Sequence, residues 1–365
     1  MNNWFDYDLA VKNYDSEWLE LSEIFRKISL NLLDDRNVTY KYLDNPAYKR
    51  VYCDRDSSCF ERAKMYEALA YGDSGVLLSS PGPALSGILL RYLGTEEQKD
   101  IFFNYLEQNK SRSFMALTEP EAGTDVLGMV SKFDLHSKKL YADKWLVNNS
   151  RDAEIGTILI KNSNKMYDIT AILLTPEILS CSNVYRETLP VTGLHGAGLG
   201  RLVFDGTDIP ENHILGADSK PSAKGFLGLM KTFYNMRPCV SALALGTAQA
   251  MLDFVKINLS SKESHYLHSE LQLRLNAARD LNLHAAKMMD IDDLNATDVS
   301  IAKYNATKIA ETIVSAMPDL VEKDIYINNI WLNKIMKDTY GFEWMEGSSD
   351  AQMFQVLQGK VKLRR

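Results

Sequence analysis

Cysteine is scarce in this chain of 365 residues, and its four copies (Cys53, Cys59, Cys181 and Cys239) are scattered. This spacing excludes a disulfide framework and a CxxC zinc site, and it favours reduced thiols inside a cell. An excess of positive charge is also absent, because 41 Lys and Arg residues stand against 48 Asp and Glu residues, for a net charge of −7. This balance argues against unspecific binding to nucleic acid or to an anionic membrane surface.

Long apolar runs are absent as well. No stretch approaches 18 uninterrupted apolar residues, and the first twenty residues carry acids but no apolar core of a secretory signal. We therefore expect a cytoplasmic protein without a membrane-spanning segment. The most basic stretch, Lys360, Lys362, Arg364 and Arg365, is interpreted as a solubilising tail.

Most short catalytic and metal-binding motifs are missing. The six histidines include neither HExxH nor HxH, and no GxSxG elbow occurs. His265 and His268 have a spacing that fits one helical face, and a solvated face explains them better than a metal site. The GxGxG within residues 195–204 precedes a strand pattern rather than a helix, so we interpret it as a turn between strands. We expect no bound metal.

Helical spacing of apolar residues marks both ends of the chain. Near the N-terminus, Leu21, Phe25 and Ile28 recur at this spacing, and a second helical run covers residues 60–71 until SSPGPALSG breaks it. Helices return from about residue 222. There, residues 240–259 are apolar nearly all round, which predicts a helix deep inside a bundle.

The middle of the chain has a different pattern. Short runs rich in branched and aromatic residues, separated by Gly, Pro, Asn and Asp, predict a small, mostly antiparallel β domain. The sequence thus predicts an α+β fold with three domains. They are an N-terminal α-helical domain at 1–112, a β domain at 113–216 and a C-terminal α-helical bundle at 217–365.

The segment FMALTEPEAGTDVLG at 114–128 combines a strand with a turn rich in backbone N–H groups and hydroxyls. Such a turn suits a polar, planar or anionic ligand. A plain loop joining two strands is the alternative, and the residues alone leave both interpretations open.

ALTEPEAGTD at 116–125 resembles the signature of the acyl-CoA dehydrogenase family. Six further stretches resemble that family in the family's own order: YLGTEEQK (92–99), ADKWLVNNS (142–150), TGLHGAGLGRLVFDGTDIPENHILG (192–216), MRPCVSALALGTAQAMLDF (236–254), SIAK (300–303) and KDTYGFEWMEGSSDAQ (337–352). The ordered set spans nearly the whole chain, so it is more specific than any single motif. It also agrees with the predicted order of helices, sheet and helices.

The resemblance implies FAD-dependent α,β-dehydrogenation of an acyl thioester. In that chemistry a carboxylate removes the proton beside the thioester carbonyl, while the β-hydrogen leaves as a hydride to the flavin. The resemblance places the base at Glu346 in WMEGSS, with Glu343 and Asp350 as rival carboxylates. It also makes the Glu346 backbone N–H a donor to the thioester carbonyl.

The resemblance implies further binding residues. Contacts to FAD map onto Met115, Leu117, Thr118, Trp145, Gln272 and Ser348. Contacts to the substrate map onto Thr124, Arg237 and Gly347. For Arg237, a salt bridge within the bundle is an equal alternative.

The chain departs from the family at three places. Val147 stands where the family usually has a Thr against the flavin. Residues 261–265 replace the RxxFG motif, whose Arg reaches the FAD pyrophosphate of a neighbouring subunit, and residues 319–324 replace the QxxGGxG loop. Lys262 offers a point charge there, without the bidentate fork of arginine. We therefore expect these departures to affect FAD binding at the subunit boundary more than they affect the fold.

Substrate and partners are less defined. We expect an acyl thioester of CoA or of a carrier protein, a specialised biosynthetic role, and an electron-transfer flavoprotein or oxygen as electron acceptor. The shared-FAD arrangement and the apolar helix at 240–259 predict a homodimer or homotetramer. A non-catalytic thioester- or partner-binding relative, and a flavin-dependent oxygenase on the same fold, are the alternatives.

Overall fold

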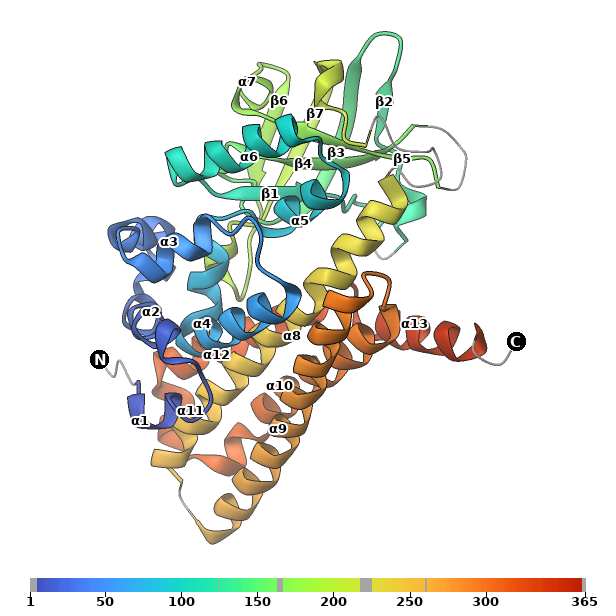
Figure 1. Ribbon diagram of the computed structural model, residues 1–365. Coiled ribbons are helices and arrows are strands. Elements are labelled where there is room, and N and C mark those ends of the chain that lie inside the picture. The colour runs from blue at the N-terminus through green and yellow to red at the C-terminus, as the bar shows by residue number, and fades with distance from the viewer. Residues whose placement is uncertain (1–4, 124, 163–166, 217–224, 260, 363–365) are drawn as a thin grey trace.

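The computed structural model describes residues 5–123, 125–162, 167–216, 225–259 and 261–362. Figure 1 shows the strands gathered at one end of the molecule, above a helical body that both ends of the chain build. The predicted α+β class and the order of helices, strands and helices are confirmed. The exact domain limits stay predictions.

The N-terminal part is helical. Its helices are α1 (Tyr7–Ala10), α2 (Ser16–Ile28), α3 (Pro46–Tyr52), α4 (Cys59–Ser79), α5 (Ala84–Leu93) and α6 (Glu96–Asn109). A capping box formed by Thr95 and Gln98 begins α6. A second box, formed by Ser58 and Glu61, begins α4.

Helix α4 is longer than predicted, because it continues past residue 71 to Ser79. Asp73 interrupts it with extended backbone, at φ −169° and ψ 119°. The buried Asp73 carboxylate lies 2.6 Å from Lys334 Nζ, on a helix far along the chain, so local sequence signals do not reveal this arrangement. The segment SSPGPALSG is also less disruptive than expected, since α5 begins inside it at Ala84.

The β domain contains two sheets and a short helix, α7 (Pro176–Leu179). The first sheet has the order β1-β4-β5, and the second has the order β2-β3-β7-β6. The strands are β1 (Ser113–Ala116), β2 (Lys132–Asp134), β3 (Lys139–Val147), β4 (Ile155–Lys161), β5 (Ile169–Leu174), β6 (Val184–Thr188) and β7 (Gly200–Asp208). β1 and β4 pair in parallel and the other pairs are antiparallel, which confirms the mostly antiparallel prediction. The GxGxG segment is a turn between β6 and β7.

The C-terminal part is a bundle. Its helices are α8 (Gly225–Ile257), α9 (Lys262–Ile291), α10 (Ala296–Leu320), α11 (Lys323–Asn328), α12 (Ile330–Thr339) and α13 (Ser349–Lys362). Helix α8 runs from the β domain to the opposite end of the molecule (Figure 1). By length and composition α8 alone among the described helices is able to cross a membrane, but its apolar window is entirely buried in the fold. Core helices of soluble proteins pass the same test, so this is weak evidence for a membrane.

Candidate active site

A cavity of about 360 Å³ lies where the β domain meets α4, α5 and α8. Its walls are mostly apolar, with few polar groups, as in many small-molecule sites. The end of β1, the end of β3, the middle of α8 and the loop before α13 all contribute to it. Five of the predicted site residues line this cavity: Met115, Leu117, Thr118, Trp145 and Glu346.

Glu346 carries the carboxylate of this cavity. Its backbone has a left-handed conformation with φ of 47°, and Gly347 follows with φ of 98°. Such a conformation is uncommon for a residue with a side chain and often occurs at functional sites. The residue is partly accessible through the cavity, but its Oε2 is buried and has no hydrogen-bond partner in the described chain. Burial raises the pKa of Glu346 to about 7, although the Lys303 and Arg237 cations oppose this rise.

The rival carboxylates are less suitable as a base. Glu343 accepts hydrogen bonds from Ser349 N at 2.7 Å and from Ser349 Oγ at 2.6 Å. Burial alone would raise the pKa of Glu343, but these hydrogen bonds, with help from lysine charges, hold it below its usual value. Asp350 is exposed. Glu346 is therefore the carboxylate that the structure leaves free to take a proton in the cavity.

Three side chains hold the loop that carries Glu346. Arg237 Nε lies 3.3 Å from Glu346 O, and Gln352 Nε2 lies 2.9 Å from Gly347 O. The buried Lys303 donates to Gly347 O and, at 3.1 Å, to Glu343 O. Sequence reasoning quoted Lys303 within the SIAK motif but gave it no role. We call these three side chains, Arg237, Lys303 and Gln352, the clamp. Their hydrogen bonds explain how an unfavourable backbone conformation persists at Glu346.

A buried ion pair supports the opposite wall. Lys144 Nζ lies 2.7 Å from Glu119 Oε1 and donates to Leu117 O at 2.9 Å, just before Thr118. Burial lowers the pKa of Lys144 to about 8, although Glu119 opposes this effect. The backbone N–H of Trp145 donates to Thr118 O at 2.8 Å, so β3 is fixed to the turn that begins at Thr118. Neither member of the ion pair was singled out from the sequence.

An orphaned acceptor lies on the same side of the cavity. Asn148 Oδ1 is buried without a hydrogen-bond partner among the described residues, and Asn148 lines the cavity. Val147 lines it too, where the family usually has a Thr. The amide oxygen of Asn148 is thus available to a donor on a bound ligand.

Comparisons with known proteins agree with this geometry. The C-terminal domain of acyl-CoA dehydrogenases matches residues 223–360, which include Glu346. The short-chain specific acyl-CoA dehydrogenase of Megasphaera elsdenii is 26% identical over 318 residues, covering 82% of this chain and 80% of that protein. Subunit CarC of the caffeyl-CoA reductase–Etf complex of Acetobacterium woodii is 26% identical over 309 residues, covering 80% of this chain and 78% of CarC. The solved FAD complex of PigA has a TM-score of 0.82 at 18% identity and covers 100% of both chains.

Residues 223–360 thus match the C-terminal domain of acyl-CoA dehydrogenases, and relatives from that family resemble about four fifths of this chain. The resemblance seen in its motifs is therefore confirmed. The roles that the family assigns to individual residues stay predictions, and the structure shows which of those residues lie together.

Several residues mapped from the acyl-CoA dehydrogenase family lie outside the cavity wall. Gly347 and Ser348 follow Glu346 without lining the cavity. Gln272 lies on α9, where its Nε2 donates to Gln249 Oε1 at 2.9 Å and to Asn276 Oδ1 at 3.0 Å. Thr124 is outside the described residues.

Arg237, also mapped from the family, lies behind Glu346 and contacts only neutral groups in the described chain. Its Nη1 lies 3.0 Å from Ser300 Oγ and 3.3 Å from Gln355 Oε1. The alternative of a bundle salt bridge therefore finds no support there. Burial lowers the pKa of Arg237 to about 10, so the side chain remains a cation near Glu346 at neutral pH.

The histidines differ partly from expectation. His265 is exposed, but His268 is buried, with its Nε2 3.0 Å from Leu252 O. The interpretation as a solvated face is thus wrong for His268, because that position of α9 packs against α8. Among the described residues, no group of three or more His, Cys, Asp and Glu side chains is placed to hold a metal ion.

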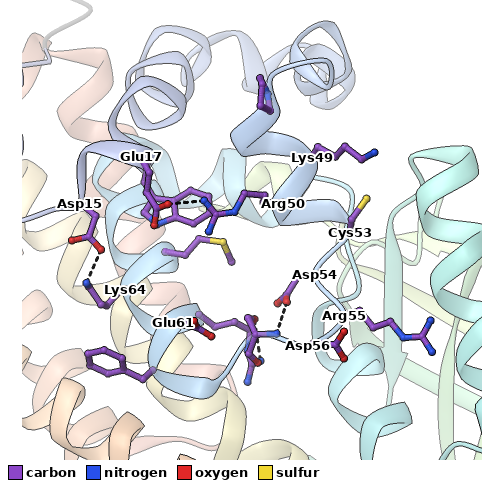
Figure 2. Close-up of a pocket in the computed structure, with 16 residues that line it drawn as sticks. Asp15, Glu17, Lys49, Arg50, Cys53, Asp54, Arg55, Asp56, Glu61 and Lys64 are labelled. Carbon is purple, nitrogen blue, oxygen red and sulfur yellow. Dashed lines mark hydrogen bonds and ion pairs between the residues drawn. The ribbon is translucent and has the colours of Figure 1, made fainter.

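A larger surface pocket of about 840 Å³ lies between α2, α3 and the start of α4 (Figure 2). Acidic and basic side chains line it in similar numbers. Many of them neutralise each other, as in the pairs Lys64–Asp15 and Arg50–Glu17, both at 2.6 Å. Glu346 does not line this pocket, whose wall includes the buried Arg62.

Proposed function

We propose that this protein is an FAD-dependent oxidoreductase that removes hydrogen from the α and β carbons of an acyl thioester, with Glu346 as the base. The observation that carries the proposal is the Glu346 carboxylate, which lies on the cavity wall with an unpartnered Oε2. A general base is most effective when its pKa lies near the working pH. Burial brings the pKa of Glu346 to about 7, which meets this condition.

The residues of the cavity fit a flavin ring. Trp145 offers an aromatic wall, Met115 and Leu117 offer apolar contacts, and Asn148 Oδ1 offers an unpaired acceptor for a ring N–H. A relative, PigA, has been solved with FAD. When bound, the flavin supplies the redox chemistry by accepting the β-hydrogen as a hydride. The residues that would hold the dinucleotide half are not gathered around this cavity.

The chain's own groups carry the proton chemistry. Glu346 Oε2 takes the proton from the α carbon, and the apolar walls keep water away from the carboxylate and so keep its pKa high. The Glu346 N–H has no backbone acceptor among the described residues, so it is free to donate to the thioester carbonyl as negative charge develops there. Arg237, Lys303 and Gln352 orient the loop that presents both groups.

For the substrate, we infer a thioester of CoA or of a carrier protein, used in a specialised biosynthetic pathway. The relative CarC belongs to a complex with Etf. This supports an electron-transfer flavoprotein as acceptor, with oxygen as the alternative. A cytoplasmic location and a homodimer or homotetramer remain part of the proposal.

The test is anaerobic mixing of the FAD-loaded protein with a panel of acyl-CoA and acyl-carrier-protein thioesters. We expect at least one thioester to bleach the flavin absorption, and the Glu346→Gln variant to bind FAD without bleaching. Asp350→Asn is the matched control, because it removes an exposed carboxylate from the same segment. A protein that stays colourless and does not take up FAD contradicts the proposal and favours the non-catalytic alternative.

A further inference from the structure

The glycine-rich turn at residues 193–198 has no role in the chemistry proposed above, yet it forms part of the cavity wall. Three of its residues line the cavity together with Asn148: Gly193, Leu194 and Ala197. Leu194 has a left-handed backbone, at φ 52° and ψ 40°. This conformation is unfavourable for a residue with a side chain, so the surrounding structure must hold it in place.

The buried carboxylate of Asp338, on α12, holds this turn. Its Oδ1 accepts a hydrogen bond from Leu194 N at 2.5 Å, and its Oδ2 lies 2.8 Å from Lys334 Nζ. All three residues are buried. A buried N–H needs an acceptor, and a charged acceptor makes a stronger hydrogen bond than a neutral one. The left-handed backbone at Leu194 therefore depends on Asp338.

Asp73, where α4 is interrupted, repeats this arrangement on the other side of Lys334. Its Oδ2 lies 2.6 Å from Lys334 Nζ and also accepts from Ser29 Oγ, while its Oδ1 accepts from Val76 N at 2.9 Å. Each carboxylate thus binds the same ammonium through one oxygen and a backbone N–H through the other. Val76 does not line the cavity, so only the N–H bound by Asp338 belongs to the cavity wall.

Two glycines let the turn pack directly on the backbone of neighbouring helices. A Cβ on Gly193 would lie 2.4 Å from Lys337 O on α12, and a Cβ on Gly196 would lie 2.4 Å from Gly75 O on α4. Neither distance leaves room for a side chain, so only glycine permits this approach. The turn thus lies tightly between α4 and α12, and a shift at either contact moves the cavity wall.

The other end of the turn reaches the part of the cavity that we assign to the flavin ring. Ala197 O accepts a hydrogen bond from Asn149 N at 2.8 Å. Asn149 directly follows Asn148, whose unpartnered Oδ1 is the proposed acceptor for a ring N–H. A displaced turn therefore displaces Asn148. An error of about 1 Å in a reacting geometry costs on the order of a hundredfold in rate.

We propose that Asp338 is a positioning residue of the active site: its carboxylate, fixed by Lys334, holds the 193–198 turn and through it the flavin ring. This inference rests on the proposed function and adds to it a residue that contacts neither flavin nor thioester. Asp338 does not line the cavity, so its effect passes through Leu194.

The experiment compares Asp338→Asn with Asp73→Asn. Each change replaces two acceptor oxygens by one oxygen and an NH₂ group, so either Lys334 or a backbone N–H loses its acceptor. Both variants should lose stability in denaturant unfolding. Amide hydrogen exchange, measured by mass spectrometry on the full chain with and without FAD, reports on Leu194 N. We expect exchange there to be at least about tenfold faster in Asp338→Asn and unchanged in Asp73→Asn.

The flavin supplies two further measurements: the visible absorption spectrum of bound FAD, and the rate of anaerobic bleaching by saturating thioester. In Asp338→Asn, the spectrum should shift and the saturated rate should fall by about ten- to a hundredfold. The thioester concentration that gives half of that rate should change much less. Asp73→Asn should keep the spectrum and the rate, although it also loses stability, so stability alone does not explain the difference.

Gly193→Ala is the second variant, because its methyl group displaces the same turn without changing a charge. It should repeat the spectral shift and the slower bleaching of Asp338→Asn. In the unaltered protein, Leu194 N should exchange as slowly as the buried amides of α12, and this measurement decides the matter if neither variant folds. Exchange as fast as in an exposed turn overturns the role of Asp338.

The two proposals fail in different ways. An unchanged spectrum and rate in folded Asp338→Asn, or equal changes in Asp338→Asn and Asp73→Asn, overturn the positioning role and leave the dehydrogenase proposal standing. An Asp338-dependent exchange and flavin spectrum, without bleaching by any thioester, support the positioning of the ring and contradict the dehydrogenase. A protein that takes up no FAD contradicts both.

Discussion

The cavity around Glu346 is lined by the middle of α8, whereas the turn between α8 and α9 lies at the end of α8 that points away from the β domain (Figure 1). At the cavity, four of the six residues that the family resemblance maps onto FAD come together with the predicted base, Glu346. At the α8–α9 turn, the family's arginine motif is replaced, and Lys262 is exposed. The contrast teaches that the groups for chemistry on a flavin ring are separable from the groups that anchor its dinucleotide.

The two regions also differ in how their charges are held. The charges near the cavity are buried and fixed by partners distant in sequence, as in Lys144–Glu119 and Lys303–Gly347. Buried groups depend strongly on their partners, whereas an exposed charge is screened by water. Substitutions at the cavity should therefore have much larger effects than substitutions at the α8–α9 turn.

The largest effect is expected from Glu346→Gln. It keeps the size of the side chain but removes its basic lone pair, so flavin bleaching by a true substrate should slow by about a hundred- to ten-thousandfold. In the protein with Glu346 intact, the base acts only when deprotonated. Because burial raises the pKa of Glu346 to about 7, the rate should rise with pH through neutrality and level off above it. Single-turnover mixing across pH measures both effects.

FAD and thioester binding should persist in Glu346→Gln, and Asp350→Asn should keep the full rate. Bleaching by Glu346→Gln at a near-normal rate means that another group takes the proton. Glu343 is then the next residue to test, although its hydrogen bonds to Ser349 make it a poor base.

The second-largest effect is expected for the buried Lys144–Glu119 ion pair, which lies beside Thr118. Lys144→Met leaves the Glu119 carboxylate buried without its cation, and such a loss typically costs about 3–5 kcal/mol of unfolding free energy. Denaturant unfolding measures the change. Lys139→Met is a matched control on the same strand, because Lys139 forms an exposed pair with Asp208 and should cost less than about 1 kcal/mol. Equal losses for the two variants contradict the structural role of Lys144.

The third-largest effect is expected on the pH dependence of the flavin-bleaching rate. Lys303→Met removes a donor to Glu343 O and Gly347 O and also removes a cation that lowers the pKa of Glu346. The pKa of Glu346 should rise further, so the rising limb of the rate should move toward alkaline pH by on the order of one unit.

Lys308→Met is the comparison for Lys303→Met, because Lys308 lies on the same helix but pairs with Glu311 near the surface. The pH profile of Lys308→Met should move much less than that of Lys303→Met. If Lys303→Met lowers the rate equally at every pH, the lysine supports the loop without tuning the base.

The sequence predicted the parts of the site that lie in local motifs. Glu346, Trp145 and the 115–118 segment stand in short motifs, so the resemblance pointed to them directly, and the structure places them around one cavity. Their roles stay predictions. The clamp and the ion pair were missed because their members are 44 residues apart for Lys303 and Gly347, and 25 for Lys144 and Glu119. Only the packed fold reveals such pairs.

The fold, too, was predictable where it depends on local sequence and not where it depends on distant residues. The three-part order and the buried α8 followed from periodicity, because each helix or strand repeats its own apolar pattern. The end of α4 did not follow from periodicity, because the buried carboxylate of Asp73 pairs with Lys334, which is 261 residues away. The buried Arg62 is similar, since an arginine at the start of a helix resembles any surface cation until its burial is known.

The smallest effect is expected at the α8–α9 turn, from Lys262→Ala. A single exposed lysine without the arginine fork contributes about 0–1 kcal/mol, so FAD affinity should fall by less than about fivefold. Lys256→Ala, which removes another exposed cation near this turn, is the control. The measurement is FAD binding by fluorescence quenching, at protein concentrations above and below the predicted oligomerisation. A loss well above tenfold that occurs only in the oligomer would show that Lys262 has taken over from the missing arginine. The cavity and the α8–α9 turn would then be equally important for the flavin, and the contrast between them would disappear.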